Sequence, residues 1–296
     1  MFVSFVTPFY GSSELLRRCV ESLLAQTDGD FEAVIVDDCS PQDGEAVVKS
    51  FGDPRIRYLR QPKNMGPCLA RQRGFREARG DYVVCVDCDD YVQPGLVAEI
   101  RKAVEADAKD APDIVVYNIE TDADGKIAPH WFRYEAGVYT SEEALAALVA
   151  KKLQWSYFAK AIRREMICEI GREMPALQEA AVCTVDDYCA VVPMMLKSRK
   201  TVVIPYYGYR YRETATSISR AVTFRKVRQA LREVRVARDL VLAYAERIQA
   251  SDASRRCVAE AAGMIRRWWL GELVASVKRR IKRGMRWRIA PGEDVE

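Results

Sequence analysis

The chain has 296 residues, of which 49% are hydrophobic and 30% charged, and this composition is typical of a soluble globular protein with one main domain and an appendage. The formal net charge is only +4, but residues 219–288 contain 19 Lys and Arg against 6 Asp and Glu. A basic segment of this kind predicts contact with anionic lipid, nucleic acid or an acidic partner. Because no apolar run approaches the length of a membrane span, we expect a protein that does not cross a bilayer.

The first 118 residues predict short buried strands that alternate with amphipathic helices. The strands are expected at Phe2–Thr7, Phe31–Val36, Ile56–Leu59, Tyr82–Val86 and Ile114–Asn118. The first helix is expected to start at Ser12 or Ser13. Three more helices are expected at Glu45–Phe51, Pro67–Arg79 and Gly95–Ala106. Strands without polar alternation, separated by such helices, indicate an α/β fold with a mostly parallel central sheet flanked by helices.

After Asn118 the pattern becomes less regular. It predicts a hairpin turn at Asp122–Gly125, helices at Ser141–Lys151 and Asp186–Lys197, strands at Thr201–Ile204 and Tyr206–Arg212, and two long helices from Phe224 onward. We therefore divide the chain into a main domain of residues 1–218, with halves at 1–118 and 119–218, and a basic helical C-terminal extension of residues 219–296.

Polar side chains follow three of the expected strands, in the segments Thr7–Tyr10, Asp37–Ser40 and Asp87–Asp90. The carboxyl ends of parallel strands open onto one rim of a sheet, where ligands bind, so we expect the three segments to lie together. The crowded carboxylates of the third segment repel one another and raise each other's pKa unless a positive charge lies between them. The sequence therefore predicts a cation at this rim.

Several motifs in a fixed order resemble family 2 glycosyltransferases, which have the GT-A, Rossmann-like nucleotide-sugar fold. They are VTPFYGSSELLRRCVESLLAQT, FEAVIVDDCSPQDG and NMGPCLARQRGFREARGDYVVCVDCDDYV, followed later by TVDDYCAVV and YYGYRYRETATSIS. The resemblance implies that residues 1–118 bind the nucleotide sugar and that residues 119–218 face the acceptor.

By this resemblance, five residues of the first half would bind the donor. Pro8 and Tyr10 would border the nucleotide base, Asp38 would hydrogen-bond the uracil, and Asp37 would support the ribose side of the pocket. Arg71 would lie near the donor, although Gln72 follows it where the family has Asn.

The resemblance also implies a metal site. Asp87 and Asp89 form the family's DxD motif: Asp89 would bind Mn²⁺ or Mg²⁺, and Asp87 would reach the ribose, or the metal through water. One or two carboxylates with phosphate oxygens are the usual ligands of such a cation, which neutralises charge on a leaving diphosphate. Arg210 or Arg212 could meet the same diphosphate.

A sugar hydroxyl is a poor nucleophile, so an inverting displacement needs a carboxylate that takes its proton. Asp186-Asp187 stands where the family has Glu-Asp, and the resemblance implies that Asp187 is the base. The implied activity is transfer from a UDP-sugar, with inversion, to a hydroxyl of a glycan or lipid-linked acceptor in bacterial surface polysaccharide or lipopolysaccharide assembly.

Each assignment has a plainer alternative. The acids at 37–38 suit a solvated turn, those at 186–187 suit the first turn of a helix, and the three arginines suit a solvated surface. His130, Trp155 and Tyr157 either touch the acceptor or pack in the core. For the whole protein, the alternatives are a haloacid-dehalogenase-like Mg²⁺-dependent phosphatase and a nucleotide-sugar-binding protein without turnover.

The expected tail helix, Ser254–Ala290, has an apolar stripe on one face and basic residues on the other. The stripe consists of Val258, Ala262, Ile265, Trp268, Trp269, Leu273, Val277 and Ile281. We interpret it as an amphipathic helix on an anionic membrane surface, with packing on the catalytic domain or a homodimer as alternatives. Nucleic acid is not expected, because basic grooves and stacking motifs are absent elsewhere. Nine scattered cysteines indicate a reduced, cytoplasmic protein, which we expect at the inner face of the cell membrane.

Overall fold

The computed structural model describes residues 1–130, 134–175, 185–213 and 223–282, apart from the side chains of residues 276, 277 and 279–282. Its strands are β1 (Val3–Phe9), β2 (Phe31–Asp37), β3 (Ile56–Arg60), β4 (Tyr82–Cys85), β5 (Tyr91–Val92), β6 (Ile114–Ala123), β7 (Lys126–Pro129), β8 (Gly137–Tyr139), β9 (Lys160–Arg163) and β10 (Thr201–Arg212). Its helices are α1 (Ser13–Leu24), α2 (Gly44–Lys49), α3 (Pro67–Glu77), α4 (Leu96–Glu105), α5 (Ser141–Val149), α6 (Arg164–Glu173), α8 (Asp186–Lys197), α9 (Phe224–Arg247) and α10 (Asp252–Lys282).

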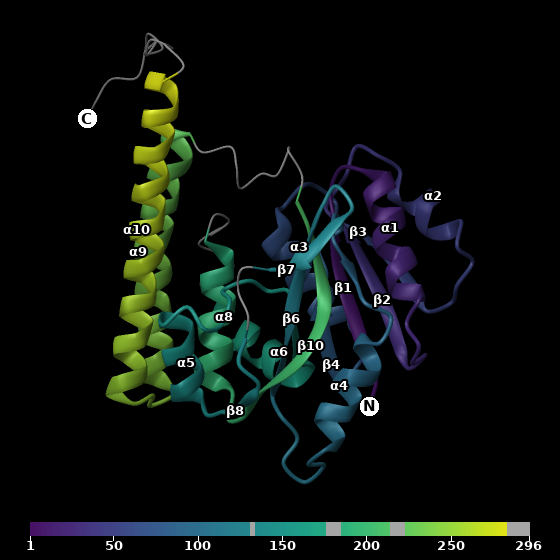
Figure 1. Ribbon diagram of the computed structural model, residues 1–296, viewed down its shortest axis with the longest axis horizontal. Helices are drawn as coiled ribbons and strands as arrows, with labels where there is room; N and C mark the ends of the chain where they lie inside the picture. The colour runs from purple at the N-terminus through teal and green to yellow at the C-terminus, as the bar shows by residue number, and fades with distance from the viewer. Residues whose placement is uncertain (131–133, 176–184, 214–222, 283–296) are drawn as a thin grey trace.

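One sheet runs through the main domain in the order β3-β2-β1-β4-β9-β6-β10-β5 (Figure 1). The strands from β3 to β4 are parallel neighbours, and β6 is parallel to β10. Between these two blocks β9 is antiparallel to both β4 and β6, and β5 is antiparallel to β10 at the edge. The predicted mostly parallel sheet flanked by helices is confirmed, and β6 continues across residue 118, so the two predicted halves share this sheet.

The strand sequences explain the layers. Every residue of β2 is buried, and its side chains alternate between two packing groups. Phe31, Ala33 and Ile35 belong to the large core that includes α1, whereas Val34 and Val36 pack with Ala70 of α3 on the other face. A strand covered on both faces needs apolar residues at every position, which accounts for the unbroken apolar runs.

Three elements beside the site differ from the sequence prediction. The strand β9 and the helix α6 that follows it were not predicted, because β9 has only four residues and begins with a lysine. The two predicted strands at 201–212 are a single strand, β10, whose pairing with β6 shifts register between Ile204 and Tyr209. The shift lies where Pro205 cannot donate a backbone hydrogen bond to the ladder.

The C-terminal extension forms a helical hairpin of α9 and α10 that packs beside α5 and α8 (Figure 1). Val258, Ala262 and Trp269 of the predicted lipid-facing stripe are buried, so this interpretation of the stripe is wrong for these three residues. An apolar stripe on a helix can be buried against lipid or against protein. Here these three residues are buried against protein. Residues 283–290 of the predicted tail helix lie outside the described part, and none of the described helices is long and apolar enough to span a membrane.

Candidate active site

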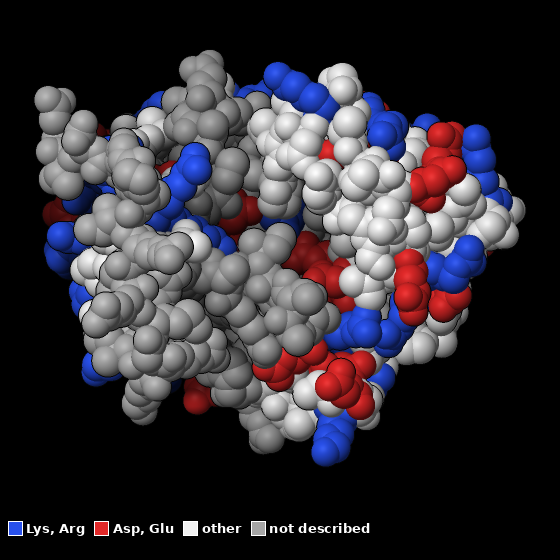
Figure 2. Space-filling model, turned by 90° about the horizontal axis from the view of Figure 1, so that it is seen from above, with Lys and Arg blue, Asp and Glu red and all other residues white. Residues whose placement is uncertain are grey.

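The three predicted polar segments meet at the carboxyl ends of the central strands. The Asp38 N–H donates to the carbonyl of Phe9 at 2.9 Å, and the Gly11 N–H donates to Ser40 Oγ at 3.1 Å, so the ends of β1 and β2 are tied together. The Val86 N–H, after β4, donates to the carbonyl of Val6 at 3.0 Å. Seen from above, this face carries Asp and Glu side chains around a central hollow (Figure 2).

Asp37 is fully buried, and both of its oxygens accept hydrogen bonds from the protein. The Ser40 N–H donates to Oδ1 at 2.6 Å, and the Tyr58 hydroxyl donates to Oδ2 at 2.5 Å, where Arg60 also pairs with it. This side chain therefore fixes the turn after β2 and ties it to β3.

Asp38 is 2% exposed and binds the loop before α3. The N–H groups of Met65 and Gly66 donate to its two oxygens, each at 2.7 Å. Gly66 has φ +86°, a conformation that L-residues with side chains rarely adopt, so this loop requires glycine. Of the two residues predicted to border the base, Pro8 is buried within β1, and Tyr10 is 56% exposed at the rim.

Arg71 of α3 joins two acidic segments that are far apart in the sequence. Its guanidinium donates to Asp87 Oδ1 at 2.7 Å and to Asp186 Oδ2 at 2.9 Å, and it lies 4.9 Å from the ring centroid of Tyr157. The side chain is 11% exposed, so the surface alternative for Arg71 is wrong. Coulombic attraction between Arg71 and the two carboxylates brings the DxD segment and the start of α8 together.

The acids after β4 have different surroundings. Asp90 is buried: its Oδ2 accepts from the Tyr209 hydroxyl at 2.6 Å, and its Oδ1 accepts from the Arg212 N–H at 2.8 Å. Tyr209 Oη also accepts the Asp87 N–H at 3.2 Å, so β10 supports the DxD segment. Burial, followed by repulsion from Asp87, raises the pKa of Asp89.

The donor set at Asp87 and Asp89 fits a hard divalent cation. Both side chains are carboxylates. Arg71 donates to Oδ1 of Asp87, and the other oxygen of that side chain, Oδ2, remains for a cation. Within the described residues no three His, Cys, Asp or Glu side chains converge as metal ligands. A cation at this place would therefore take one or two protein oxygens and complete its shell with phosphate oxygens and water, which is the usual manner of Mg²⁺.

Asp187 lies in the first turn of α8, and its Oδ1 accepts the Tyr157 N–H at 3.1 Å. Burial, followed by the charge of Asp186, raises the pKa of Asp187 to about 7. A carboxyl group with that pKa exchanges a proton near neutral pH, as a general base must. The second acid, Asp186, is the partner of Arg71.

The two arginines of β10 have separate surroundings. Arg210 Nε donates to Glu120 at 3.0 Å, and its guanidinium lies 5.6 Å from the ring centroid of Tyr91. Arg212 is tied to the acidic segment by its N–H, which donates to Asp90 Oδ1 at 2.8 Å, and its charge lowers the pKa of Asp89 against the larger effect of burial. The structure thus brings Arg212, and not Arg210, toward the DxD segment.

Three aromatic or imidazole side chains of the acceptor half pack against neighbours. His130 is 8% exposed and lies edge-on to Tyr211, Trp155 is stacked on Tyr188, and Tyr157 lies under Arg71. The packing alternative therefore holds for His130. Residues 176–184 and 214–222, which include Thr184 and most of the ETATSIS segment, lie outside the described part.

Sequence reasoning missed three residues that support the site, namely Asp90, Tyr209 and Lys160. Asp90 was visible next to the DxD motif, and Tyr209 lies in the quoted YYGYRYR stretch. Lys160 is fully buried in β9, and its only signal in the sequence is a lysine within the apolar run Tyr157–Ile162.

Comparison of the chain with known proteins identifies similar glycosyltransferases. The sequence model of the family described as Glycosyl transferase family 2 matches residues 4–167. Succinoglycan biosynthesis protein ExoO of Rhizobium meliloti is 40% identical over 119 residues, which cover 40% of this chain and 33% of that protein. Glycosyltransferase GlyG of Streptococcus pneumoniae is 29% identical over 238 residues, which cover 74% and 73% of the two chains.

Among solved structures, S. aureus TarS 1–349 in complex with UDP-GlcNAc superposes with a TM-score of 0.61 over 97% of this chain and 93% of that chain, at 14% identity. A likeness at that identity shows the shared fold. The family model covers more than half of the chain, which excludes the phosphatase alternative: the chain belongs to glycosyl transferase family 2 and is a glycosyltransferase.

Proposed function

We propose that the protein is an inverting, metal-dependent glycosyltransferase that moves a sugar from a UDP-sugar to a hydroxyl group of a glycan or lipid-linked acceptor. The observation that carries this proposal is the pair of bonds from Arg71 to Asp87 and to Asp186. Through them the DxD segment and the start of α8 are neighbours, which a one-step displacement needs because donor and acceptor must meet in one place.

For the donor, we propose UDP-sugar binding at the rim formed by β1, β2 and β4. The similar TarS structure was solved with UDP-GlcNAc, which supports this choice of nucleotide. The exposed ring of Tyr10 offers a flat surface to the base. Asp38 would turn its remaining lone pairs to the uracil, and Asp37 would keep the turn after β2 in place for the ribose.

For the cation, we propose that Asp89 binds Mn²⁺ or Mg²⁺, with Asp87 beside it. When bound, the ion neutralises charge on the diphosphate as it leaves. Arg71 fixes Asp87 from the protein side, and Tyr209 fixes the backbone of Asp87 and the side chain of Asp90. Arg212 adds positive charge on the same side of the sheet.

For the base, we propose Asp187. Its carboxylate would take the proton of the acceptor hydroxyl while that oxygen attacks the anomeric carbon opposite the departing UDP, which inverts the anomeric centre. The Tyr157 N–H orients one oxygen and leaves the other for the hydroxyl proton. No covalent bond between sugar and enzyme is needed in this reaction.

For the acceptor, we propose a lipid-linked glycan in bacterial surface polysaccharide assembly, since ExoO is named for succinoglycan biosynthesis.

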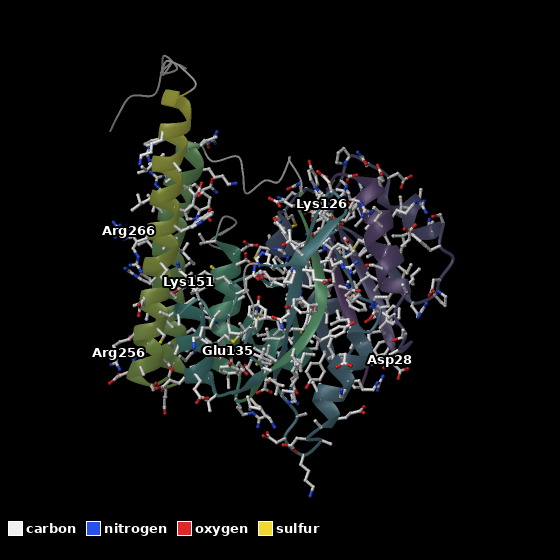
Figure 3. The ribbon with its side chains drawn as sticks, in the orientation of Figure 1. Asp28, Lys126, Glu135, Lys151, Arg256 and Arg266 are labelled. Carbon is white, nitrogen blue, oxygen red and sulfur yellow. The ribbon has the colours of Figure 1, made fainter. Side chains whose placement is uncertain are left out.

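For the membrane, we propose contact through α10. The C-terminal end of α10 lies on the same side of the molecule as the carboxyl ends of the strands (Figure 1). From its middle onward, α10 has exposed side chains at Arg266, Arg267, Trp268, Leu270, Val274 and Lys278. Arg266 and Arg256 point away from the sheet (Figure 3). Exposed tryptophan beside cationic side chains suits an anionic membrane surface.

The donor and metal are tested by thermal shift with UDP- and GDP-sugars, each with Mn²⁺ or with EDTA. We expect stabilisation by one UDP-sugar that depends on Mn²⁺, followed by metal-dependent release of UDP. An Asp89→Asn variant should lose the metal-dependent part of the shift, and the exposed-turn variant Asp124→Asn should keep it. Stabilisation by GDP-sugars alone would contradict the proposed donor.

The membrane proposal is tested by sedimentation with phosphatidylglycerol vesicles. Because each tryptophan and cationic side chain contributes on the order of 1 kcal/mol, Trp268→Ala and Lys278→Gln together should reduce partitioning about tenfold or more. The control is Ile127→Ala, which removes an exposed apolar side chain from β7. Equal sedimentation of all three proteins would refute membrane contact through α10.

A further inference from the structure

Lys160 is a charged side chain that the proposed mechanism does not use, and it is completely buried in β9. Its ammonium group donates to three backbone carbonyls, those of Gln154 at 3.0 Å, Ser156 at 2.7 Å and Phe158 at 3.5 Å. Lysine is almost never fully buried without an acidic partner. Among the described residues its hydrogen-bond partners are these three carbonyls and no carboxylate, so carbonyl dipoles solvate the charge.

The three carbonyls belong to one short loop, residues 154–159, which we call the β9 loop. This loop contacts both acidic segments of the site. The Tyr157 N–H donates to Asp187, and the Tyr157 ring lies under Arg71. The Phe158 ring is stacked on Tyr209, with centroids 4.7 Å apart. The ammonium group of Lys160 therefore binds three carbonyls of the loop whose Tyr157 N–H positions the proposed base, Asp187.

The charge of Lys160 also acts on Asp187. Burial lowers the pKa of Lys160 to about 7, and attraction to Asp187 opposes that effect. The Ser156 carbonyl that accepts from Lys160 and the Tyr157 N–H that donates to Asp187 belong to one peptide group, so a protonated Lys160 polarises that group and favours the carboxylate form of Asp187. The other titratable or charged groups that act on Asp187 are Arg71 of α3, Cys85 of β4, Asp87, Tyr157, and Asp186 and Cys189 of α8.

We propose that Lys160 is a positioning residue for the transfer reaction, which organises the β9 loop around the base and keeps Asp187 ionised. This inference rests on the proposed role of Asp187. It adds a second function to what a purely structural lysine would do, because a structural lysine would fix the loop without changing the proton affinity of the base.

The test compares Lys160→Met, Lys160→Gln and Lys160→Arg with the wild type, by kcat and by the pH dependence of kcat/KM for UDP release at saturating Mn²⁺. Methionine keeps the length of the side chain and removes the charge. Glutamine is neutral but donates to carbonyls, so it carries the test if the methionine variant does not fold. Lys152→Met is the matched control, since Lys152 is an exposed lysine close by in sequence.

We expect Lys160→Met and Lys160→Gln to lose about tenfold to hundredfold in kcat, because small misplacement of a reacting group has effects of this size. The acidic limb of their profiles should move to higher pH, since removal of a nearby positive charge favours the protonated form of a carboxyl group. Lys160→Arg should restore the limb, and Lys152→Met should match the wild type.

A loss of kcat in the neutral variants with an unmoved limb would overturn the proposed effect on Asp187, and so would an unchanged kcat. Asp187→Asn separates this inference from the proposed function. If that variant is inactive and the limb is unmoved in Lys160→Met, only the role of Lys160 is wrong. If Asp187→Asn still releases UDP at the wild-type rate, the proposed base itself is wrong.

Discussion

The acidic pair on the donor side, Asp37–Asp38, and the acidic pair at the start of α8 differ in how the protein satisfies their carboxylates. On the donor side, each of the four oxygens accepts at least one short hydrogen bond from a neighbouring group. Asp187 instead accepts the N–H of Tyr157 alone at Oδ1, and burial raises its pKa to about 7. Hydrogen bonds hold carboxylates of the first kind in one orientation, which suits binding, whereas a desolvated carboxyl group such as that of Asp187 exchanges protons near neutral pH, which suits catalysis.

The largest effect that follows from this contrast is expected for Asp187→Asn. The amide cannot take the acceptor proton, so transfer should fall by about 10²–10⁴-fold. Donor binding should persist, because the donor-side contacts are untouched. Rates come from UDP release and affinity from calorimetry, with Asp124→Asn as the control at an exposed turn. A variant that retains most of its transfer activity would show that the contrast has no catalytic meaning.

Arg71→Met removes the contact between the two regions. It leaves Asp87 and Asp186 without their guanidinium, and loss of one partner from a buried ion pair costs about 3 kcal/mol, at the lower end of the usual range because Asp87 is 27% exposed. Urea denaturation measures the change in the free energy of unfolding. Arg76→Met, an exposed arginine of the same helix, should change stability by less than about 0.5 kcal/mol. Similar values for the two variants would argue against a structural link through Arg71.

Asp38→Asn tests whether the donor side depends on its hydrogen bonds. One oxygen becomes an amide that faces an N–H donor in the loop before α3, which should cost about 1–3 kcal/mol of stability. The KM for the donor should rise while kcat changes little. Urea denaturation and initial rates measure the two quantities. Unaltered stability and KM would mean that this loop does not need the carboxylate.

The smallest expected effect concerns the wild type itself, whose transfer rate should depend on pH. Because the base works as a carboxylate, transfer should rise with pH up to about 7 and fall about tenfold per unit below it. The raised pKa means that the folded state binds the proton more tightly than the unfolded state. Asp187 therefore contributes less to stability as pH rises from about 4 to 7. A rate profile that is flat between pH 5.5 and 7 would contradict this.

The first half of the fold was predictable because its signals are local. Apolar runs such as Phe31–Val36 and periodic helices such as Gly95–Ala106 appear in the structure with ends that differ by one residue. The short strand β9 was not predictable, because four residues that begin with a buried lysine carry no strand pattern. Its place between β4 and β6 depends on hydrogen bonds to strands that are distant in the chain.

The site divides in the same way. The acids at 37–38, 87–89 and 187 were recognisable from motifs, since each follows a strand or starts a helix in a family order. The function of Arg71 as a link between Asp87 and Asp186 was not, because those partners are 16 and 115 residues away in sequence. The stripe on α10 shows the converse: its apolar pattern was clear, but the pattern does not say whether lipid or protein covers it.

The sequence by itself determined the fold class, the family and the identity of the acidic residues at the strand ends, since each depends on residue type and spacing along the chain. Only the tertiary structure decided which carboxylates are hydrogen-bonded and which are desolvated, because that balance depends on neighbours such as Tyr209, Tyr157 and Lys160 that come from other elements. Proton affinity in a folded protein is set by what surrounds a group in space, and sequence distance carries almost no information about that.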